Sequence, residues 1–375
     1  MKWVLWSLGG ILLLVIIVIA IGVFYFQKEI KKEDPSYLVN FLKENRDRKG
    51  LSLSIHYNNQ PWVAVHPDEK LPLASTVKII VAIEYARQAA AGKVDPNQPV
   101  QVGELETYYI PKSDGGAHEA WLESLGKDAA PKEVPLSEVA NGMIAYSSNA
   151  NTDYLIRILG MDAINQLLDE LKLTHHERIY PIVAALYIPT YVAQKNSLSK
   201  EETNKVLQEM ELVQYQALAE EIHQQWEDTP LTDDEKKQVL ADLTKELERN
   251  WSDRLPRSTT AEYIGILNRL NTKSDFQPDV YTYLDPVMEQ LMQNPNNQEW
   301  LSHAGQKGGS TRFILTNAMY ATDLSGNKTE FAFFANDLTS MEQAKLSRNL
   351  NGFQLKFLKD EDFREQVKRE LAREE

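Results

Sequence analysis

Alternating apolar and polar positions near the start of the chain predict a β-hairpin. Residues 51–57 alternate, the two asparagines at 58–59 provide a turn, and residues 62–65 again suit a strand. From Ser75 the apolar positions recur three and four residues apart, and this pattern continues into an Ala-rich stretch that ends at Gly92. That periodicity predicts a helix directly after the hairpin.

Helical periodicity dominates the middle of the chain. It runs over residues 136–173 and then over a Gln- and Glu-rich tract at 195–250. Within that tract, residues 207–226 and 233–251 are each expected to form a helix. We interpret the tract as a solvated helical hairpin and assign no chemistry to it.

Strand patterns return after Trp300. Residues 313–321 and 330–335 are expected to be strands joined by a turn at 324–327, and an amphipathic helix is expected from about Ser340. The order is therefore strands, a helical middle, strands and a helix. We expect the first and last strands to share one antiparallel sheet, which makes the fold class α+β.

The N-terminus has a pattern of its own. Residues 4–26 carry no charge and are mostly apolar, and at about 1.5 Å per residue a helix of this length would cross a bilayer. A cleaved signal peptide is the alternative, since Lys2 precedes the run and Ala20-Ile21-Gly22 is a weak cleavage site. The run continues to Phe26, beyond a typical signal core, and this favours an uncleaved anchor.

This anchor divides the chain into two parts. Residues 1–36 are expected to form a transmembrane anchor and a charged stalk, and residues 37–375 one domain with a helical insertion at about 190–256. The orientation stays open at this point. Three lysines follow the span, and a count of positive charges would keep that side inside, but large following domains often override the count.

Composition narrows the function. The 375 residues include no Cys, which excludes a disulfide scaffold, zinc–cysteine and iron–sulfur sites and a Cys nucleophile. The net charge is −14, and because residues 1–32 carry +3 the remainder carries −17. Such an acidic body repels phosphate backbones, so no nucleic-acid partner is expected.

Ser-x-x-Lys occurs four times, but only one copy opens an apolar helix. In Ser75-Thr76-Val77-Lys78 the spacing of three places both side chains on one helical face, and apolar flanks would lower the pKa of the lysine. A serine at a first turn also lies beside backbone N–H groups that can stabilise an oxyanion. A simple helix cap is the alternative. The other copies lie in Gly- or charge-rich segments: Ser124–Lys127, Ser197–Lys200 and Ser325–Lys328.

Two further stretches carry suitable groups. Tyr146-Ser147-Ser148-Asn149 lies between two predicted helices and offers a hydroxyl and an amide. Lys307-Gly308-Gly309-Ser310-Thr311 is expected to lead into the 313–321 strand, and it combines a cation with a small-residue edge on which a peptide-like ligand can lie. Taken singly, the first stretch is also typical of a helix cap and the second of a turn.

In this order the three stretches resemble the active-site elements of the penicillin-recognising serine enzymes, most closely class A β-lactamases, whose signature is S-x-x-K, S-D-N and K-T-G. The likeness covers most of residues 45–358. It extends to flanking residues at 144–149, 258–261 and 316–317. It also fits the order of strands, helical middle and strands, and it implies the β-lactamase/transpeptidase-like fold.

The resemblance implies roles for the matched residues. Ser75 would be the acylated nucleophile, Lys78 its base, and Ser147 the group that passes a proton to the leaving nitrogen. The backbone N–H groups of Ser75 and Ser310 would form the oxyanion hole. Substrate would be held by three further residues: Asn149, Lys307 and Gly309.

The chain also departs from the family pattern. Ser148 stands where class A enzymes have Asp, and Gly308 replaces a hydroxyl residue that would bind the substrate carboxylate. Counted from Arg178, the deacylating Glu position falls at Val183, and the only acid nearby is Glu177. Loss of that base would slow deacylation, because general-base help is typically worth 10²–10⁴-fold.

The sequence therefore indicates a serine acyl-transfer enzyme that acts on β-lactams, peptidoglycan stem peptides or both. Such substrates imply a single-pass cell-membrane protein with its catalytic domain outside the cell. No cofactor is expected, and no metal, since His175-His176-Glu177 lacks the i, i+4 spacing of helical ligands. The alternative is a non-catalytic, membrane-anchored wall-binding or partner-binding module on the same fold. The sequence leaves the oligomeric state open.

Overall fold

The structure, a computed structural model, describes residues 33–126 and 131–372. In this part of the chain no helix is both long and apolar enough to cross a membrane. The predicted anchor, residues 4–26, lies outside the described residues, so it stays a prediction. The described chain forms two compact units, and each is treated by itself below.

The smaller unit comprises residues 33–48 and 338–372 and consists of three helices that contact one another. Its apolar residues gather between them, with the rings of Phe353 and Phe363 in edge-to-face contact at 5.6 Å. A helix begins at Ser340, as the sequence predicted. The helices are α2 (Tyr37–Glu44), α17 (Ser340–Lys359) and α18 (Glu361–Leu371).

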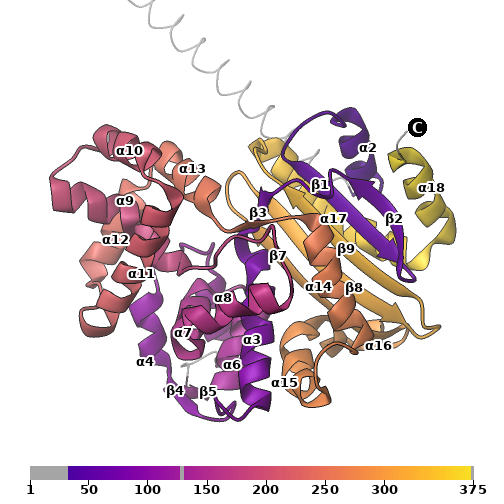
Figure 1. The fold of residues 1–375 in the computed structure, drawn as a ribbon, viewed down its shortest axis with the longest axis horizontal. Coiled ribbons are helices and arrows are strands. Elements are labelled where there is room, and N and C mark those ends of the chain that lie inside the picture. Colours follow the sequence, from indigo (N-terminus) through magenta and orange to yellow (C-terminus); the bar gives the residue numbers. More distant parts are fainter. Residues whose placement is uncertain (1–32, 127–130, 373–375) are drawn as a thin grey trace, which may run out of the picture. The chain divides into compact units, whose positions relative to one another are not determined.

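The larger unit contains a five-stranded antiparallel sheet in the order β2-β1-β9-β8-β7 (Figure 1). Leu53 in the second strand of that order pairs with Val65 on one side and with Phe333 on the other. The expected sheet of N- and C-terminal strands, and with it the α+β class, is confirmed. The strands are β1 (Leu51–Tyr57), β2 (Gln60–Val65), β7 (Leu301–Ser310), β8 (Leu315–Asp323) and β9 (Lys328–Ala335).

The strand that ends in the Lys-Gly-Gly stretch differs from the prediction. Lys307 was expected to lie just ahead of the 313–321 strand, but it belongs to a separate strand, β7, and pairs with Ala318 of β8. A tight turn joins the two strands, with the Thr311 N–H donating to Ile314 O at 3.1 Å. The Lys-Gly-Gly sequence has no apolar alternation, so the pattern gave no indication of this strand.

Helices account for the rest of the larger unit. One of them, α14, packs across β1, β8 and β9, and Figure 1 shows it crossing the sheet. Another, α3, is buried along nearly its whole length and contacts α6, α7, α8 and α15. Two short strand pairs complete the unit: β3 (Leu71–Pro72) with β6 (Arg257–Ser258), and β4 (Pro99–Gln101) with β5 (Glu133–Pro135).

The helices of the larger unit lie mostly in the middle of the sequence. Those predicted over residues 136–173 are observed as three separate helices, α6 to α8. In chain order the helices and 3₁₀ turns are η1 (Ala74–Val77), α3 (Lys78–Ala90), α4 (Val102–Leu105), η2 (Glu106–Tyr108), α5 (Ala117–Leu125), α6 (Leu136–Ala145), α7 (Asn149–Leu159), α8 (Met161–Glu170), α9 (Ile182–Asn196), α10 (Lys200–Glu209), α11 (Leu212–Asp228), α12 (Asp233–Asp242), α13 (Lys245–Arg254), α14 (Thr260–Thr272), α15 (Pro278–Met288), η3 (Gln290–Gln293) and α16 (Pro295–Gln298).

The helical tract after α9 is more divided than predicted. Residues 207–226 span the end of α10 and most of α11, and residues 233–251 span α12 and much of α13. Capping side chains explain the breaks: Glu211 forms a capping box at the start of α11, and the Thr244 hydroxyl accepts the Leu247 N–H at 3.3 Å. Two helices therefore stand where each single one was expected.

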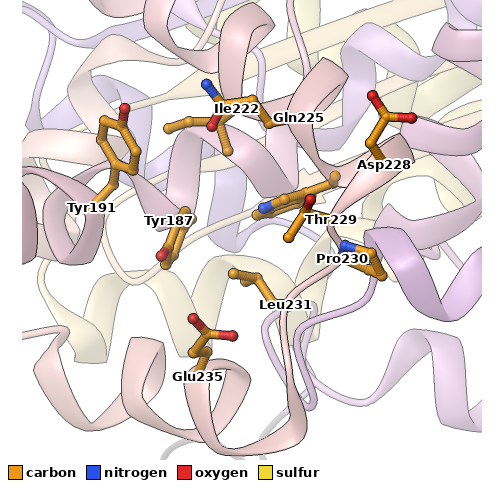
Figure 2. Close-up of a pocket in the computed structure, with 10 residues that line it drawn as sticks. Tyr187, Tyr191, Ile222, Gln225, Asp228, Thr229, Pro230, Leu231 and Glu235 are labelled. Carbon is orange, nitrogen blue, oxygen red and sulfur yellow. The ribbon is translucent and has the colours of Figure 1, made fainter.

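The tract also packs apolar side chains against α9 and holds four helices, so its interpretation as a solvated helical hairpin was wrong. Tyr187 of α9 and Trp226 of α11 pack with their ring centres 5.7 Å apart. A cavity of about 410 Å³ lies beside them and is lined from α9, α11, α12 and the loop between the last two (Figure 2). These two rings are only 6% and 3% exposed, so they offer little surface to a ligand. None of the predicted site residues lines this cavity.

Candidate active site

Ser75 lies on a strained turn that the surrounding structure holds from both sides. Ala74, just before it, has φ +45°, a left-handed conformation that costs a residue with a side chain of order 1–3 kcal/mol. The Leu73 N–H donates to Pro256 O at 2.9 Å, and Leu73 O accepts from the Thr316 hydroxyl at 2.8 Å. These bonds fix the backbone ahead of Ser75, whose own side chain is half-buried.

Lys78 is fully buried at the start of α3, one turn after Ser75. Its Nζ donates to Ser147 O at 2.6 Å and to Asn149 Oδ1 at 2.7 Å, and the Ser147 hydroxyl lies 3.3 Å away. The two short bonds go to oxygens that can only accept. An uncharged amine has two N–H groups for these oxygens and keeps a lone pair that can accept from a hydroxyl. The geometry therefore suits Lys78 as a free base.

Electrostatics favour the same form. Burial holds the pKa of Lys78 well below its usual value, and the charge of Lys307 lowers it further, while Asp114 and Asp153 oppose the shift. Lys307 is itself buried, and this lowers its pKa to about 7. Burial lowers the pKa of both lysines because a low-dielectric site disfavours an ammonium ion without a direct counter-ion. An anionic group bound beside Lys307 would restore its charge.

The Ser147–Asn149 stretch forms one wall of the site. Ser147 has φ +73°, which turns the chain between α6 and α7, and its side chain is half-buried. The Asn149 N–H donates to Asp114 Oδ2 at 3.2 Å. Because the amide oxygen of Asn149 accepts from Lys78, the orientation of this side chain is fixed.

Ser148, the residue that differs from the family pattern, contributes to the local structure of the turn. It is fully buried, and its hydroxyl accepts the Asn151 N–H at 3.2 Å, which caps the start of α7. The same oxygen lies 2.9 Å from the Nδ1 atom of the buried His118. This position therefore stabilises the turn, and Ser148 is not among the side chains that bond to Lys78.

β7 forms the opposite wall. A Cβ atom on Gly309 would lie 2.5 Å from the Ser75 backbone nitrogen and 2.7 Å from the Thr316 hydroxyl, so only glycine allows the strand to pass this close. Gly308 is different, since a Cβ there would meet nothing nearer than 3.6 Å. Ser310 ends the strand, and β7 is the edge strand of its sheet. The structure thus brings the Lys-Gly-Gly-Ser stretch directly beside Ser75.

The position that the resemblance assigns to the deacylating base is occupied by Val183, at the start of α9. Val183 is buried, and its N–H donates to Asp153 Oδ2 at 2.8 Å. The carboxylate of Glu177 is committed elsewhere: it accepts the Arg257 N–H at 3.1 Å, and Lys70 lies 3.5 Å away. Neither residue therefore offers a free carboxylate in the structure.

Sequence reasoning assigned no role to three residues of this site, although Thr316 lies in one of the flanking stretches that carry the resemblance. Thr316 holds the turn before Ser75, Asp114 holds the backbone of Asn149, and Asp153 binds the start of α9. The only signal in the sequence for Asp153 is that it follows Asn149 by four positions, which places both on one face of a helix.

His175-His176-Glu177 is the stretch at which the sequence analysis considered a metal site and expected none. The His175 N–H donates to a carboxylate oxygen of Glu262 at 2.7 Å, and His176 Nδ1 lies 2.7 Å from Glu177 O. Within residues 33–126 and 131–372, no group of three or more His, Cys, Asp or Glu side chains could hold a metal ion.

Solved structures with the same fold include β-lactamases. The enzyme from Chitinophaga pinensis is 12% identical with a TM-score of 0.53, covering 86% of this chain and 98% of that chain. That from Sphaerobacter thermophilus is 17% identical with a TM-score of 0.52, covering 88% and 99%. A class A β-lactamase from Bacteroides cellulosilyticus is 13% identical with a TM-score of 0.51, covering 91% and 99%. At these identities the likeness shows the fold.

The family is shown by sequence. A search of curated proteins found no match to this chain. A family model described as the beta-lactamase enzyme family matches residues 36–250, which is more than half of the chain. The resemblance first drawn from three short motifs is therefore confirmed at the level of the family. This chain belongs to the beta-lactamase enzyme family and is a serine hydrolase.

Proposed function

We propose that the chain is a membrane-anchored acyl-transfer enzyme that reacts with β-lactams or peptidoglycan stem peptides through an acyl-enzyme on Ser75. One observation carries this proposal. Lys78 is fully buried one turn after the half-buried Ser75, and its amine bonds to both Ser147 and Asn149. A pure binding module has no need of a buried amine beside a serine, so this arrangement favours catalysis over the non-catalytic alternative.

The acylation step follows from the positions of these groups. The Ser75 hydroxyl gives its proton to the Lys78 amine as its oxygen bonds to the substrate carbonyl carbon. The resulting oxyanion accepts from the backbone N–H groups of Ser75 and Ser310, which the close approach at Gly309 brings together. When the carbon–nitrogen bond breaks, Ser147 passes a proton from Lys78 to the leaving nitrogen, since its hydroxyl lies 3.3 Å from that amine.

Substrate binding is assigned to the β7 wall and to Asn149. A peptide-like ligand can lie along the edge of β7, with Gly309 providing the clearance for this approach. Lys307 would face the substrate carboxylate and gain its charge on binding, because burial otherwise lowers its pKa to about 7. The Asn149 side-chain oxygen binds Lys78, and its NH2 group would face the substrate amide.

Covalent labelling tests the proposal. The full-length chain in a non-ionic detergent is incubated with a fluorescent penicillin, denatured, and examined for a fluorescent band. We expect a stable label at a ratio approaching one per chain. Absence of label at millimolar penicillin would contradict the β-lactam substrate class.

The role of Lys78 is tested by Lys78→Arg. Arginine keeps the positive charge but does not give it up near neutral pH, so we expect the acylation rate to fall by about 10²–10⁴-fold. The measurement is the rate of label uptake by stopped-time gel fluorescence. Lys70→Arg is the matched control, since Lys70 is 43% exposed and pairs with Glu177. Near-normal acylation in the Lys78 variant would refute its role as base.

The anchor is tested separately. We expect residues 4–26 to remain on the mature protein and to hold it in the cell membrane with the catalytic domain outside. The measurement is the N-terminal sequence of protein recovered from membranes, together with protease access in intact cells. A mature chain that starts near Val23 would show a cleaved signal peptide, and protection of the domain in intact cells would contradict the orientation.

A further inference from the structure

A buried histidine lies behind the Ser147–Asn149 turn and has no part in the chemistry described so far. His118 of α5 is fully buried, and its ring contacts two aromatic side chains, with ring centres 4.4 Å from Tyr109 and 5.5 Å from Trp121. The indole N–H of Trp121 donates in turn to Glu138 Oε1 at 3.0 Å. These contacts restrict the orientation of the imidazole ring.

The polar contact of this ring is with Ser148. Nδ1 of His118 lies 2.9 Å from Ser148 Oγ, which also accepts the Asn151 N–H at 3.2 Å and lies 2.9 Å from Asn151 Oδ1. The Asn151 side chain is oriented by its other end, because its Nδ2 donates to Val139 O at 3.1 Å. Since the amide oxygen of Asn151 can only accept, the single hydroxyl proton of Ser148 points to that oxygen.

This arrangement determines which nitrogen of His118 carries a proton. Ser148 Oγ has only a lone pair left for the imidazole, so Nδ1 must be the N–H donor of their hydrogen bond. The other nitrogen, Nε2, has no hydrogen-bond partner within residues 33–126 and 131–372, and a carboxylate oxygen of Glu106 is 3.5 Å away. The bond to Ser148 is therefore the hydrogen bond that ties this ring to its surroundings.

Ser148 is the central residue of the turn that binds Lys78. The Nζ atom of Lys78 donates to Ser147 O at 2.6 Å and to Asn149 Oδ1 at 2.7 Å, and these two residues flank Ser148. Ser147 has φ +73°, a strained conformation that persists only where the surrounding structure holds it. A bond that fixes Ser148 therefore helps to fix both oxygens that bind the amine.

We propose that His118 is a positioning residue for acylation: its Nδ1–H group holds Ser148, and through Ser148 it sets the position of the two oxygens that bind Lys78. This inference rests on the proposed Ser75–Lys78 chemistry. It assigns His118 no contact with substrate and no proton transfer.

Two neutral substitutions separate the roles of the two ring nitrogens. The amide nitrogen of asparagine can take the place of Nδ1, whereas that of glutamine reaches the place of Nε2. His118→Asn therefore keeps a donor for Ser148, and His118→Gln does not, although both remove the ring. The measurement is the rate of fluorescent-penicillin labelling of the full-length chain, with melting temperatures recorded for each variant. His175→Gln is the control, since that side chain is 53% exposed.

We expect His118→Gln to acylate about 10–100-fold more slowly than the parent, because a displacement of about 1 Å at a catalytic group has effects of this size. His118→Asn and the control should label at close to the parent rate. Ser148→Ala removes the acceptor, so adding His118→Gln to that variant should cause no further loss. Equal losses in the two His118 variants, or a further loss in the Ser148 variant, would mean that the ring acts by its bulk and would overturn the inference.

A second measurement uses the parent chain and does not depend on how the variants fold. Heteronuclear NMR of the full-length chain, labelled at its histidine nitrogens, reports which ring nitrogen is protonated, and the His118 signal is identified by its absence from His118→Asn. We expect a proton on Nδ1. An unprotonated Nδ1 would overturn the inference and leave the proposed function in place. A parent chain that takes no label at any penicillin concentration would refute the proposed function, and the inference with it.

Discussion

The full-length chain that carries Ser75→Ala is expected to take up no covalent label from a fluorescent penicillin under conditions in which the parent chain is labelled. Alanine has no oxygen to form the ester. Among the serines that the structure describes, only Ser75 combines a held turn, a buried lysine one turn later and a strand so close that a Cβ atom on Gly309 would clash with the serine backbone. Complete loss of label is therefore the expected result, measured by gel fluorescence and by intact-protein mass.

The other Ser-x-x-Lys serines supply matched controls. Ser124 lies in α5 and donates to Trp121 O at 2.6 Å, and Ser325 lies in an exposed turn between β8 and β9. Ser124→Ala and Ser325→Ala should label like the parent. Equal melting temperatures would show that all three variants fold. Label retained in the Ser75 variant, or lost in either control, would contradict the assignment.

The three motifs could be joined from sequence because each is local. Ser75-Thr76-Val77-Lys78 needs only a spacing of three and apolar flanks. The strands on either side of the turns at 58–59 and 324–327 are likewise indicated by their own residues. The order of strands and helices then favoured one shared sheet, and the pairing of Leu53 with Phe333 bears this out.

The placement of β7 beside Ser75 depends on tertiary contacts, which a local sequence pattern does not indicate. β7 was not recognised as a strand because it is rich in glycine, which weakens a strand signal, and one of these glycines, Gly309, is required for the approach to Ser75. Gly309 could be recognised as essential only once the Ser75 nitrogen was known to lie where its Cβ would be. A functional requirement therefore removed the pattern from which the element would have been predicted.

The buried polar groups were missed for a related reason. In the sequence Asp153 looks like an ordinary helix-surface acid and Asp114 like an ordinary turn residue, and their roles arise from tertiary contacts. Asp153 meets the first N–H groups of α9, 29 and 30 residues further along the chain. Such a contact depends on tertiary packing, which neither spacing nor composition encodes.

An acyl adduct on Ser75 should persist for minutes, so that the chain behaves as a penicillin-binding protein and not as an efficient resistance enzyme. Acylation requires Ser75, Lys78 and the oxyanion N–H groups. Deacylation also requires a water molecule held and deprotonated beside the ester, and the buried aliphatic side chain of Val183 can do neither. Loss of a general base is worth about 10²–10⁴-fold, or about 3–5 kcal/mol at 1.36 kcal/mol per decade.

The two carboxylates near that position are already bound. Glu177 accepts from the Arg257 backbone and lies beside Lys70, and both oxygens of Asp153 accept N–H groups at the start of α9. Stopped-time mass spectrometry after a penicillin pulse measures the adduct lifetime directly. Glu177→Gln tests the carboxylate that the sequence offered as the nearby acid, because a lifetime that lengthens in this variant would make Glu177 the base. We expect an unchanged adduct lifetime in this variant, since the Glu177 carboxylate is already bonded to Arg257 of β6. Rapid steady hydrolysis of penicillin by the parent chain, without an accumulated adduct, would contradict the prediction.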